Sequence, residues 1–149
     1  GIFDLHAAVM GWEVTQSLAF EIATHWQGLT PVTRAMLQDQ GRTTEPEYRA
    51  ALGELQGIRL LMDALLSRFD AILTLAAPGE APEGTATGDP IYNRLWSVLQ
   101  VPLVCLPVGK GPKCLPIGVQ LVGARGADHR LDSTALFLEM AVAAQGDAT

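Results

Sequence analysis

The stretch "PLVCLPVGKGPKCLPIGVQLVG", residues 102–123, decides the fold of this chain. It contains two apolar segments, 102–109 and 116–123, whose composition is typical of buried strands. Only the connection "KGPKCL" separates the two segments. A connection this short suits two antiparallel strands joined as a hairpin. The stretch therefore predicts a β-hairpin in the second half of the sequence.

The segments on either side of this hairpin predict one more strand and two helices. "DAILTLA", residues 70–76, is a short apolar run with β-branched members and predicts a strand. Residues 77–90 are rich in Pro and Gly and predict a loop. A helix is expected from about residue 90 to 99, and apolar residues at helical spacing predict a closing helix over 131–142.

The first part of the sequence, residues 1–68, predicts helices alone. Apolar residues at helical intervals predict one long helix over residues 4–27. A short helix is expected next, between an N-cap at Thr30 and a left-handed glycine at Gly41.

The third helix has the clearest signals in the sequence. Thr44 and Glu47 have the spacing of a capping box, in which each residue satisfies a backbone or side-chain group of the other. Apolar side chains then recur at helical intervals up to Ser67.

Together these elements predict an α/β fold with a small mixed sheet of about three strands packed with helices. The strand at 70–76 would run parallel to that at 102–109 if both share a sheet, because crossover connections are right-handed. Both are apolar at nearly every position, which is typical of a sheet covered on both faces. So few helices can hardly cover both faces, which indicates that part of a larger fold is missing. We expect a single domain over 1–149, with a helical region at 1–68 and the sheet region at 69–145.

Composition and charge exclude several functions. With 149 residues, 48% of them hydrophobic, the chain is long enough for one domain with a sizeable core. The net charge is -6 and the acids are scattered, so we expect neither nucleic acid nor a membrane surface as partner. No apolar run approaches the roughly 20 residues of a membrane span, and no signal peptide is recognisable. A cytoplasmic location is the resulting expectation.

We expect no metal, no cofactor and no disulfide. The three histidines, His6, His25 and His129, lie in different predicted elements without carboxylates or thiolates at ligand spacing. Cys105 falls inside an apolar strand and Cys114 follows a Gly-Pro turn. Two such isolated cysteines are expected to be free thiols.

Several motifs, read in order, resemble one known family. The segments "FDAILTLAAPGEAPEG", "TGDPIYNRLWSVLQVPLVCLPVG", "LPIGVQLVGARGADHRL" and "ALFLEMA" are similar to the C-terminal third of the amidase signature family. The earlier segment "TPVTRAMLQDQGRTTEPEYRAAL" fits the same region, so the resemblance covers nearly the whole chain. Two positions depart from the family pattern: Leu75 stands where members usually have Pro, and Gln100 where they usually have Gly.

The resemblance implies a partial α/β/α layer of an amidase fold and cofactor-free hydrolysis of carboxamides. The A subunit of the tRNA-dependent amidotransferase belongs to the same family. Its members use a Ser-Ser-Lys arrangement, in which a lysine activates one serine through another. The Gly/Ser-rich segment that supplies both serines has no counterpart in this sequence. The serines lie singly in helical patterns, at Ser17, Ser67, Ser97 and Ser133. The lysines, Lys110 and Lys113, fall in the predicted hairpin turn, so no catalytic residue is assigned.

The resemblance does imply a substrate pocket, because in the family the loop after the first strand and the following helix face the substrate channel. Its candidate residues here are Thr87, Gly88, Asp89, Asn93 and Trp96. Asn93 would donate or accept a hydrogen bond, Trp96 would form an apolar wall, and Asp89 would orient the loop or bind an amine. Structural roles are the alternatives: Asp89 as a helix cap, Asn93 as a tie between loop and backbone, and Trp96 as part of the core.

Glu80 and Glu83 lie in the same loop, where an acid/base pair is conceivable. Nothing apolar surrounds them in the sequence, so we expect a solvated acidic loop instead. The loop as a whole, residues 77–90, is expected to be more mobile than the strand and helix that it joins.

Two functions remain open at this point. The first is the C-terminal part of an amidase signature hydrolase, which supplies pocket walls but is inactive alone. The alternative is a non-enzymatic interaction or assembly module derived from an amidase. The expected partners are the missing N-terminal portion of an amidase, a small amide substrate in the complete enzyme, or a second copy of the chain in a homodimer.

Overall fold

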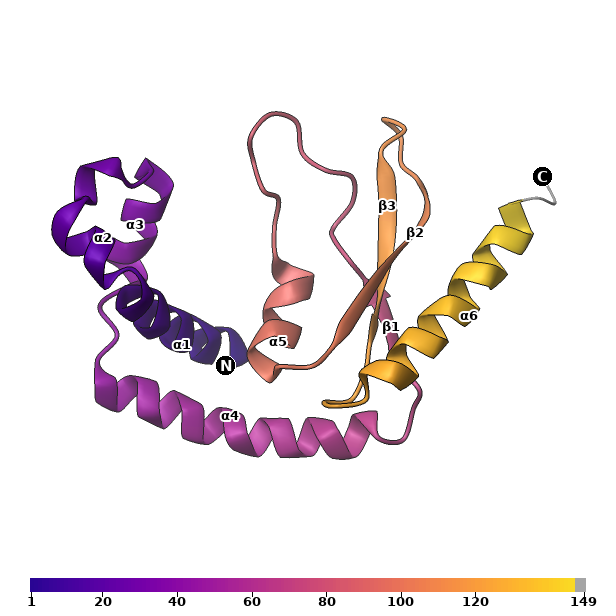
Figure 1. Ribbon diagram of the computed structural model, residues 1–149, viewed down its shortest axis with the longest axis horizontal. Coiled ribbons are helices and arrows are strands. Elements are labelled where there is room, and N and C mark those ends of the chain that lie inside the picture. Colours follow the sequence, from indigo (N-terminus) through magenta and orange to yellow (C-terminus); the bar gives the residue numbers. More distant parts are fainter. Residues whose placement is uncertain (147–149) are drawn as a thin grey trace. The chain divides into compact units, whose positions relative to one another are not determined.

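The computed structural model describes residues 1–146, and these divide into two units after Ile58 (Figure 1). The division falls inside α4 (Glu45–Leu66). No helix among the described residues is long and apolar enough to cross a membrane.

Helices build the first unit, which ends within α4. Its elements are α1 (Ile2–Ser17), α2 (Ala19–Thr24), the 3-10 turn η1 (Trp26–Gly28), α3 (Pro31–Gln40) and the first turns of α4. The prediction of one continuous helix over 4–27 is wrong, because the helix is interrupted at Leu18 and ends at His25. At the second break the Thr24 hydroxyl donates to the Phe20 carbonyl and contacts His25 Nδ1. Such side-chain bonds compete with the backbone ladder and favour a helix end.

The ends of α3 follow the sequence signals in part. The Thr30 side chain accepts a hydrogen bond from the Thr33 amide at 3.2 Å, which confirms the predicted N-cap. Gly41 is the C-cap, but its φ of -70° is not left-handed, so that part of the prediction is wrong. A Cβ at Gly41 would clash with the Leu37 carbonyl oxygen of α3 and would lie 2.9 Å from the Thr15 hydroxyl of α1. Gly41 is thus needed because a side chain there would meet both the last turn of α3 and α1.

The start of α4 confirms one half of the predicted capping box, the bond from the Thr44 amide to the Glu47 side chain. The Thr44 amide donates to Glu47 Oε2 at 2.8 Å, and the Thr44 hydroxyl donates to the same oxygen at 2.7 Å. One turn further, Tyr48 stacks on Trp12 of α1 with 5.6 Å between ring centroids. This stacking packs the first turns of α4 on α1.

The second unit, from Arg59 onward, contains the sheet. Its elements after α4 are β1 (Ile72–Leu75), α5 (Ile91–Leu99), β2 (Leu103–Lys110), β3 (Pro116–Val122) and α6 (Asp128–Gly146). The three strands are ordered β1-β3-β2, and β3 pairs antiparallel with both neighbours. The hairpin prediction is confirmed. β1 and β2 run in the same direction, as the crossover argument requires, but they lie on opposite sides of β3 and do not pair.

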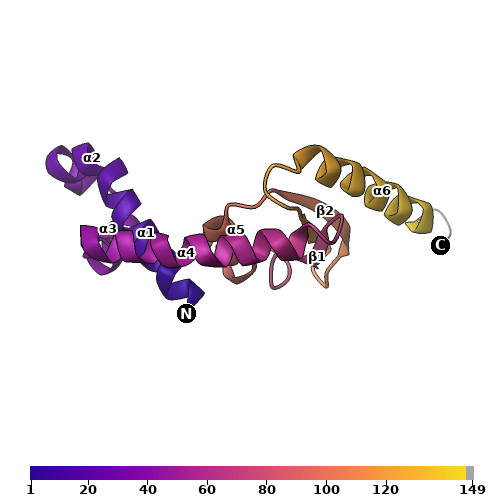
Figure 2. The same cartoon turned by 90° about the horizontal axis from the view of Figure 1, so that it is seen from below.

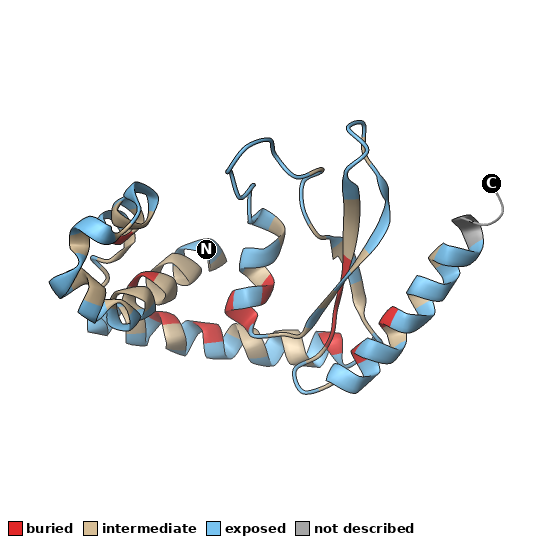
Figure 3. Ribbon diagram, turned by 45° about the horizontal axis from the view of Figure 1, so that its top comes forward, coloured by how far each residue is buried: buried red, intermediate tan, exposed pale blue. Residues whose placement is uncertain are grey.

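The two faces of this sheet carry different elements. On one face, buried Leu121 packs with Leu131 and Ala135 of α6, and Val104 and Leu106 of β2 pack against this cluster. Figures 1 and 2 both show α6 alongside the sheet, and Figure 3 shows buried residues on β3 and on the first turns of α6. The opposite face is turned toward α5 and the loop 77–90. The fold class predicted from the sequence, α/β with a small three-stranded sheet packed with helices, is confirmed. The sheet is antiparallel throughout, however, and not mixed, because β1 and β2 both pair with β3 and not with each other.

Polar contacts fix the last turns of α4 to this unit. Arg59 donates twice to the Val98 carbonyl near the end of α5, at 2.7 and 3.2 Å. Asp63 forms a bidentate ion pair with Arg125, which follows β3. The connection between β3 and α6 is therefore held to α4 by the Asp63–Arg125 ion pair.

Candidate functional site

A hollow of 730 Å³ lies between the loop 77–90, the N-terminal end of α5 and the sheet face opposite α6. Four of the five predicted pocket residues line it: Thr87, Gly88, Asp89 and Asn93. The sheet contributes Cys105 and Pro107 of β2, and Pro116 and Gly118 of β3. The sequence-predicted residues are thus brought together around one cavity, with the exception of Trp96.

Trp96 is buried, with 9% of its surface exposed, and is not among the residues that line the hollow. It points away from the cavity side because it lies on the apolar side of the amphipathic helix α5, together with buried Leu99. Its placement agrees with the core role weighed as the alternative.

Asp89 and Asn93 each make a structural hydrogen bond and keep capacity for more. Asp89 Oδ1 accepts the Ile91 amide at 3.0 Å in an Asx-type turn that leads into α5, whose N-cap is Pro90. Asn93 Nδ2 donates to the Ala76 carbonyl at 3.3 Å, which ties the end of β1 to α5. A carboxylate and a primary amide have several further donor and acceptor positions. Both side chains are exposed and line the hollow, so a ligand can reach them.

Gln120 supports the wall of the hollow through its hydrogen bonds to β1 and α5. The sequence analysis did not identify this residue. It lies in β3 opposite Thr74 and Cys105, and only 3% of its surface is exposed. Its side-chain amide donates to the Leu75 carbonyl at 3.0 Å and to the Tyr92 carbonyl at 2.9 Å. One buried side chain thereby joins the end of β1 to the first turn of α5. A polar residue in the middle of the run "GVQLV" was the available signal, because buried polar groups need partners.

The expectation that Glu80 is merely solvated is wrong. Its carboxylate accepts hydrogen bonds from the backbone amides of Lys113 and Leu115, at 2.9 and 3.0 Å, in the turn of the β2–β3 hairpin. Glu83 contacts the same turn through the Lys113 ammonium group at 2.5 Å. Sequence reasoning missed the pairing because the partners lie at least 30 residues away and two of them are backbone amides, which no sequence pattern identifies.

The charged residues that line the hollow are both acidic, Glu80 and Asp89, and no Lys or Arg side chain of the described residues is among its lining. The remainder of the lining is mainly Ala, Pro and Gly. Such a site suits a neutral or cationic ligand with a small apolar body, since a carboxylate would meet like charge without a compensating cation.

Among the described residues, the lining of the hollow contains no nucleophile paired with an activating base. Cys105 is a free thiol on its wall, but no His or Lys of the described residues lines the hollow to activate it. Within residues 1–146, no group of three or more His, Cys, Asp or Glu is arranged to hold a metal ion. The geometry provides walls and hydrogen-bonding groups for a ligand.

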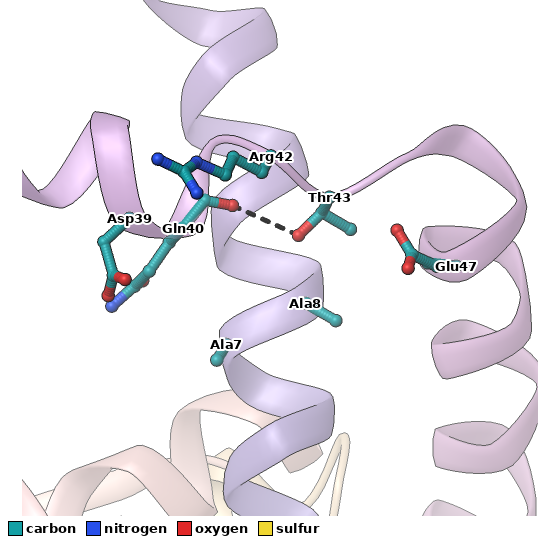
Figure 4. A pocket seen from close by; sticks show the side chains of 7 residues that line it. All are labelled: Ala7, Ala8, Asp39, Gln40, Arg42, Thr43 and Glu47. Carbon is teal, nitrogen blue, oxygen red and sulfur yellow. Dashed lines mark hydrogen bonds between the residues drawn. The ribbon is translucent and has the colours of Figure 1, made fainter.

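A second hollow, of 460 Å³, lies in the first unit (Figure 4). Ala7 and Ala8 of α1 form one side, and Gln40 and Thr43 lie opposite them, joined by a 3.1 Å bond from the Thr43 hydroxyl to the Gln40 carbonyl. The Glu47 carboxylate at its edge is engaged by the capping box. Its polar groups therefore hold the connection between α3 and α4.

Comparisons with known proteins bear on this arrangement. No protein-family model matches the chain. The chain is 32% identical over 106 residues to the glutamyl-tRNA(Gln) amidotransferase A subunit from Wolinella succinogenes, which covers 64% of this chain and 24% of that protein. The corresponding protein of Pseudothermotoga lettingae is 34% identical over 94 residues, covering 56% of this chain and 20% of that protein.

Solved structures with a similar fold include an amidase. A crystal structure of an amidase superimposes with a TM-score of 0.77 and 28% identity, covering 88% of this chain and 33% of that one. A vestigial protein complex that reveals the origins of an s-triazine catabolic enzyme matches with a TM-score of 0.69 at 21% identity, and supports the fold alone.

The fold is therefore that of one part of an amidase. The chain is similar to amidase signature proteins over a part of their length. It spans about a quarter of the curated relatives and a third of the amidase structure.

Proposed function

We propose that this chain supplies substrate-pocket walls of an amidase signature hydrolase, which cleaves the C–N bond of a small carboxamide, and that it does not supply the catalytic residues. The hollow between loop 77–90, α5 and the sheet carries this proposal. Thr87, Gly88, Asp89 and Asn93 converge there on a fold that matches an amidase at 28% identity.

In this function, the partner of the chain is the remainder of an amidase, which would bring the nucleophile, its base and the oxyanion donors. Asn93 would hydrogen-bond the substrate, and the Ala- and Pro-rich wall would contact its apolar acyl part. Asp89 would favour a neutral or amine-bearing substrate over a carboxylate. The reaction requires no cofactor, and the cytoplasm is the proposed location.

The proposal is tested by adding small amides to the isotope-labelled chain and following the backbone amide signals by NMR. Three ligands of one length separate the charge classes: hexanamide, 6-aminohexanamide and the anionic adipic acid monoamide. We expect signals of Gly88 and Asn93 to shift with the first two and much less with the third. No hydrolysis above background is expected from the chain alone, because binding walls without a nucleophile give little rate.

Uniform shifts with all three ligands, or none at Gly88 and Asn93, would contradict the pocket assignment. Hydrolysis by the chain alone that is lost on changing one of its serines to Ala would contradict the absence of catalytic residues.

The alternative, an interaction module that assembles with a second copy, is favoured by one observation. Leu136, Phe137 and Met140 of α6 are 60–74% exposed. Apolar side chains gathered on one helix surface are typical of an association site. A homodimer formed through α6 is the form that this alternative takes.

A further inference from the structure

Glu80 is the least exposed residue of the loop that borders the hollow. Every other residue of 77–90 is exposed, whereas Glu80 is half-buried. Burying a charged side chain is costly unless hydrogen bonds compensate the charge, so charged residues are usually the most exposed. The backbone amides of Lys113 and Leu115 provide that compensation.

The hairpin turn is shaped to receive this carboxylate. A Cβ built on Gly111 would lie 2.5 Å from Glu80 Oε1, closer than real Cβ atoms approach a neighbour. The φ of Gly111 is not in the left-handed region, so an added Cβ would meet the Glu80 side chain and would displace its carboxylate. Gly109, two residues earlier, has no atom within 4 Å of the same position. The missing side chain at Gly111 therefore leaves the space that the Glu80 carboxylate occupies.

Apart from the contacts of Glu80 and Glu83, the hydrogen bonds that join the loop to the other described residues lie near its two ends. At its start the Ala76 amide donates to the Gly118 carbonyl at 3.2 Å, and Asn93 of α5 donates to the Ala76 carbonyl. Between these ties and the Asp89–Ile91 bond, Glu80 accepts hydrogen bonds from backbone amides, and both members of the Glu83–Lys113 ion pair are exposed. An exposed ion pair contributes little to holding a loop.

We propose that Glu80 is a strap that fastens the loop 77–90 to the β2–β3 hairpin and thereby sets the width of the hollow. Its carboxylate bridges one wall of the hollow, the loop, to the turn that follows Pro107 and precedes Pro116 on the other wall. Glu80 is thus a positioning residue for whatever ligand occupies the hollow. The consequence for ligands depends on the proposed function, whereas the strap itself does not.

The strap is tested by hydrogen exchange of single backbone amides in the whole chain. The Lys113 and Leu115 amides bond to Glu80, whereas the neighbouring Gly111 and Cys114 amides bond to backbone carbonyls of the turn and serve as internal references. In Glu80→Ala we expect exchange at Lys113 and Leu115 to rise about tenfold, the effect of losing one charge-assisted hydrogen bond. Exchange at the two reference amides should change much less.

Two matched controls separate the strap from general loosening. Glu83→Ala removes a carboxylate from the same loop, and Gly109→Ala adds a methyl group to the same hairpin in open space. Neither should alter exchange at Lys113 or Leu115. Gly111→Ala should reproduce the effect of Glu80→Ala, and the double variant should be no worse than either, because both act on one contact.

Glu80→Gln provides a rescue, since both closest bonds end on Oε1, an oxygen that glutamine keeps. It should restore part of the protection lost in Glu80→Ala. Protection of the Gln120 and Val122 amides in the sheet should be retained in every variant and shows that each is folded. Unchanged exchange at Lys113 and Leu115 in folded Glu80→Ala, or equal effects of Gly109→Ala and Gly111→Ala, would overturn the strap.

The effect on the hollow is measured separately, with 4-fluorobenzamide as a fluorine NMR probe. If the hollow binds amides, Glu80→Ala and Gly111→Ala should weaken binding of the probe about three- to tenfold, whereas Glu83→Ala and Gly109→Ala should not. Equal affinity in wild type and strap variants would overturn the role in setting the width. Failure of the wild-type chain to bind the probe would contradict the proposed function, and the exchange measurement would still decide the strap.

Discussion

The Gln120 side chain donates one hydrogen bond to the Tyr92 carbonyl at 2.9 Å and so joins the central strand of the sheet to the first turn of α5. The same amide nitrogen donates to Leu75 at the end of β1. Both partners lie next to residues of the hollow, Ala76 and Asn93. The local geometry of the candidate site thus rests on one buried polar residue in an otherwise apolar strand.

Replacing Gln120 by Leu should lower the free energy of unfolding by about 2–4 kcal/mol, because two partly buried hydrogen bonds to backbone carbonyls would be lost. Chemical denaturation measures the change. Gln56→Leu, at an exposed position of α4, is the matched control and should alter stability by less than about 0.5 kcal/mol. A Gln120→Leu variant as stable as wild type would show that the two carbonyls are satisfied in another way.

The Asp63–Arg125 ion pair predicts a loss of stability in acid. The hydrogen bond from Arg125 lowers the pKa of Asp63 below its ordinary value, and burial opposes this only in part. A depressed pKa in the folded state means that the pair stabilises the fold above the unfolded pKa, about 4, and that this contribution is lost as the pH falls further.

Asp63→Asn should remove this part of the pH dependence, so that its stability and that of wild type converge as the pH falls through the lowered pKa of folded Asp63. Unfolding midpoints measured between about pH 7 and pH 2 test the prediction. Asp132→Asn, an exposed change on α6, is the control and should leave the acid slope of wild type in place. A constant difference between Asp63→Asn and wild type at every pH would contradict the linkage.

Gln100 has a left-handed backbone, with φ 58° and ψ 41°, at the end of α5. It stands where the amidase signature family usually has Gly, which adopts this conformation without strain. Gln100→Gly should therefore stabilise the chain by about 1 kcal/mol. Gln56→Gly makes the same chemical change inside α4 and should destabilise by a similar amount. Denaturation midpoints that move in the same direction for both variants would contradict this explanation.

The parts of the fold that sequence predicted correctly are those set by local chemistry. The β2–β3 hairpin follows from two apolar runs and a short turn, and the start of α4 from Thr44 and Glu47 three residues apart. The break at Leu18 was missed because no capping side chain marks it. Local signals thus located most elements but not every boundary.

The residues of the loop that line the candidate site could be predicted from the sequence, but the residues that hold this loop and α5 in place could not. Resemblance to a family pointed to Thr87, Gly88, Asp89 and Asn93, which do line one hollow. The Glu80 contact with the hairpin turn and the Gln120 bonds link residues far apart in sequence to backbone atoms. Such contacts depend on the register of β1 and β2 against β3, which the sequence does not determine by itself.

Association through α6 is the prediction attached to the alternative function. Light scattering over a range of concentrations should show a mass above that of one chain. Phe137→Glu should shift the population toward the monomer by about tenfold or more in Kd, because a charge would be buried in an apolar contact. Ser133→Glu, at another exposed position of α6, is the control and should have little effect. A wild-type chain that is monomeric at every concentration would remove support for the dimer.

The most direct test of the proposed function concerns Asn93 in a complete amidase that carries residues 1–149 as the corresponding part. Asn93→Ala should change kcat/KM for the preferred amide by about tenfold or more, the scale of one lost hydrogen bond to the reacting substrate. Because Asn93 also bonds the Ala76 carbonyl, Ala76 amide exchange should be followed in the same variant to detect a displaced loop. Arg94→Ala, at the next exposed position of α5, is the control and should leave kcat/KM within about twofold. A tenfold loss with the loop undisturbed would place Asn93 on the substrate, whereas unchanged kinetics on every amide would return Asn93 to the structural role of tying β1 to α5.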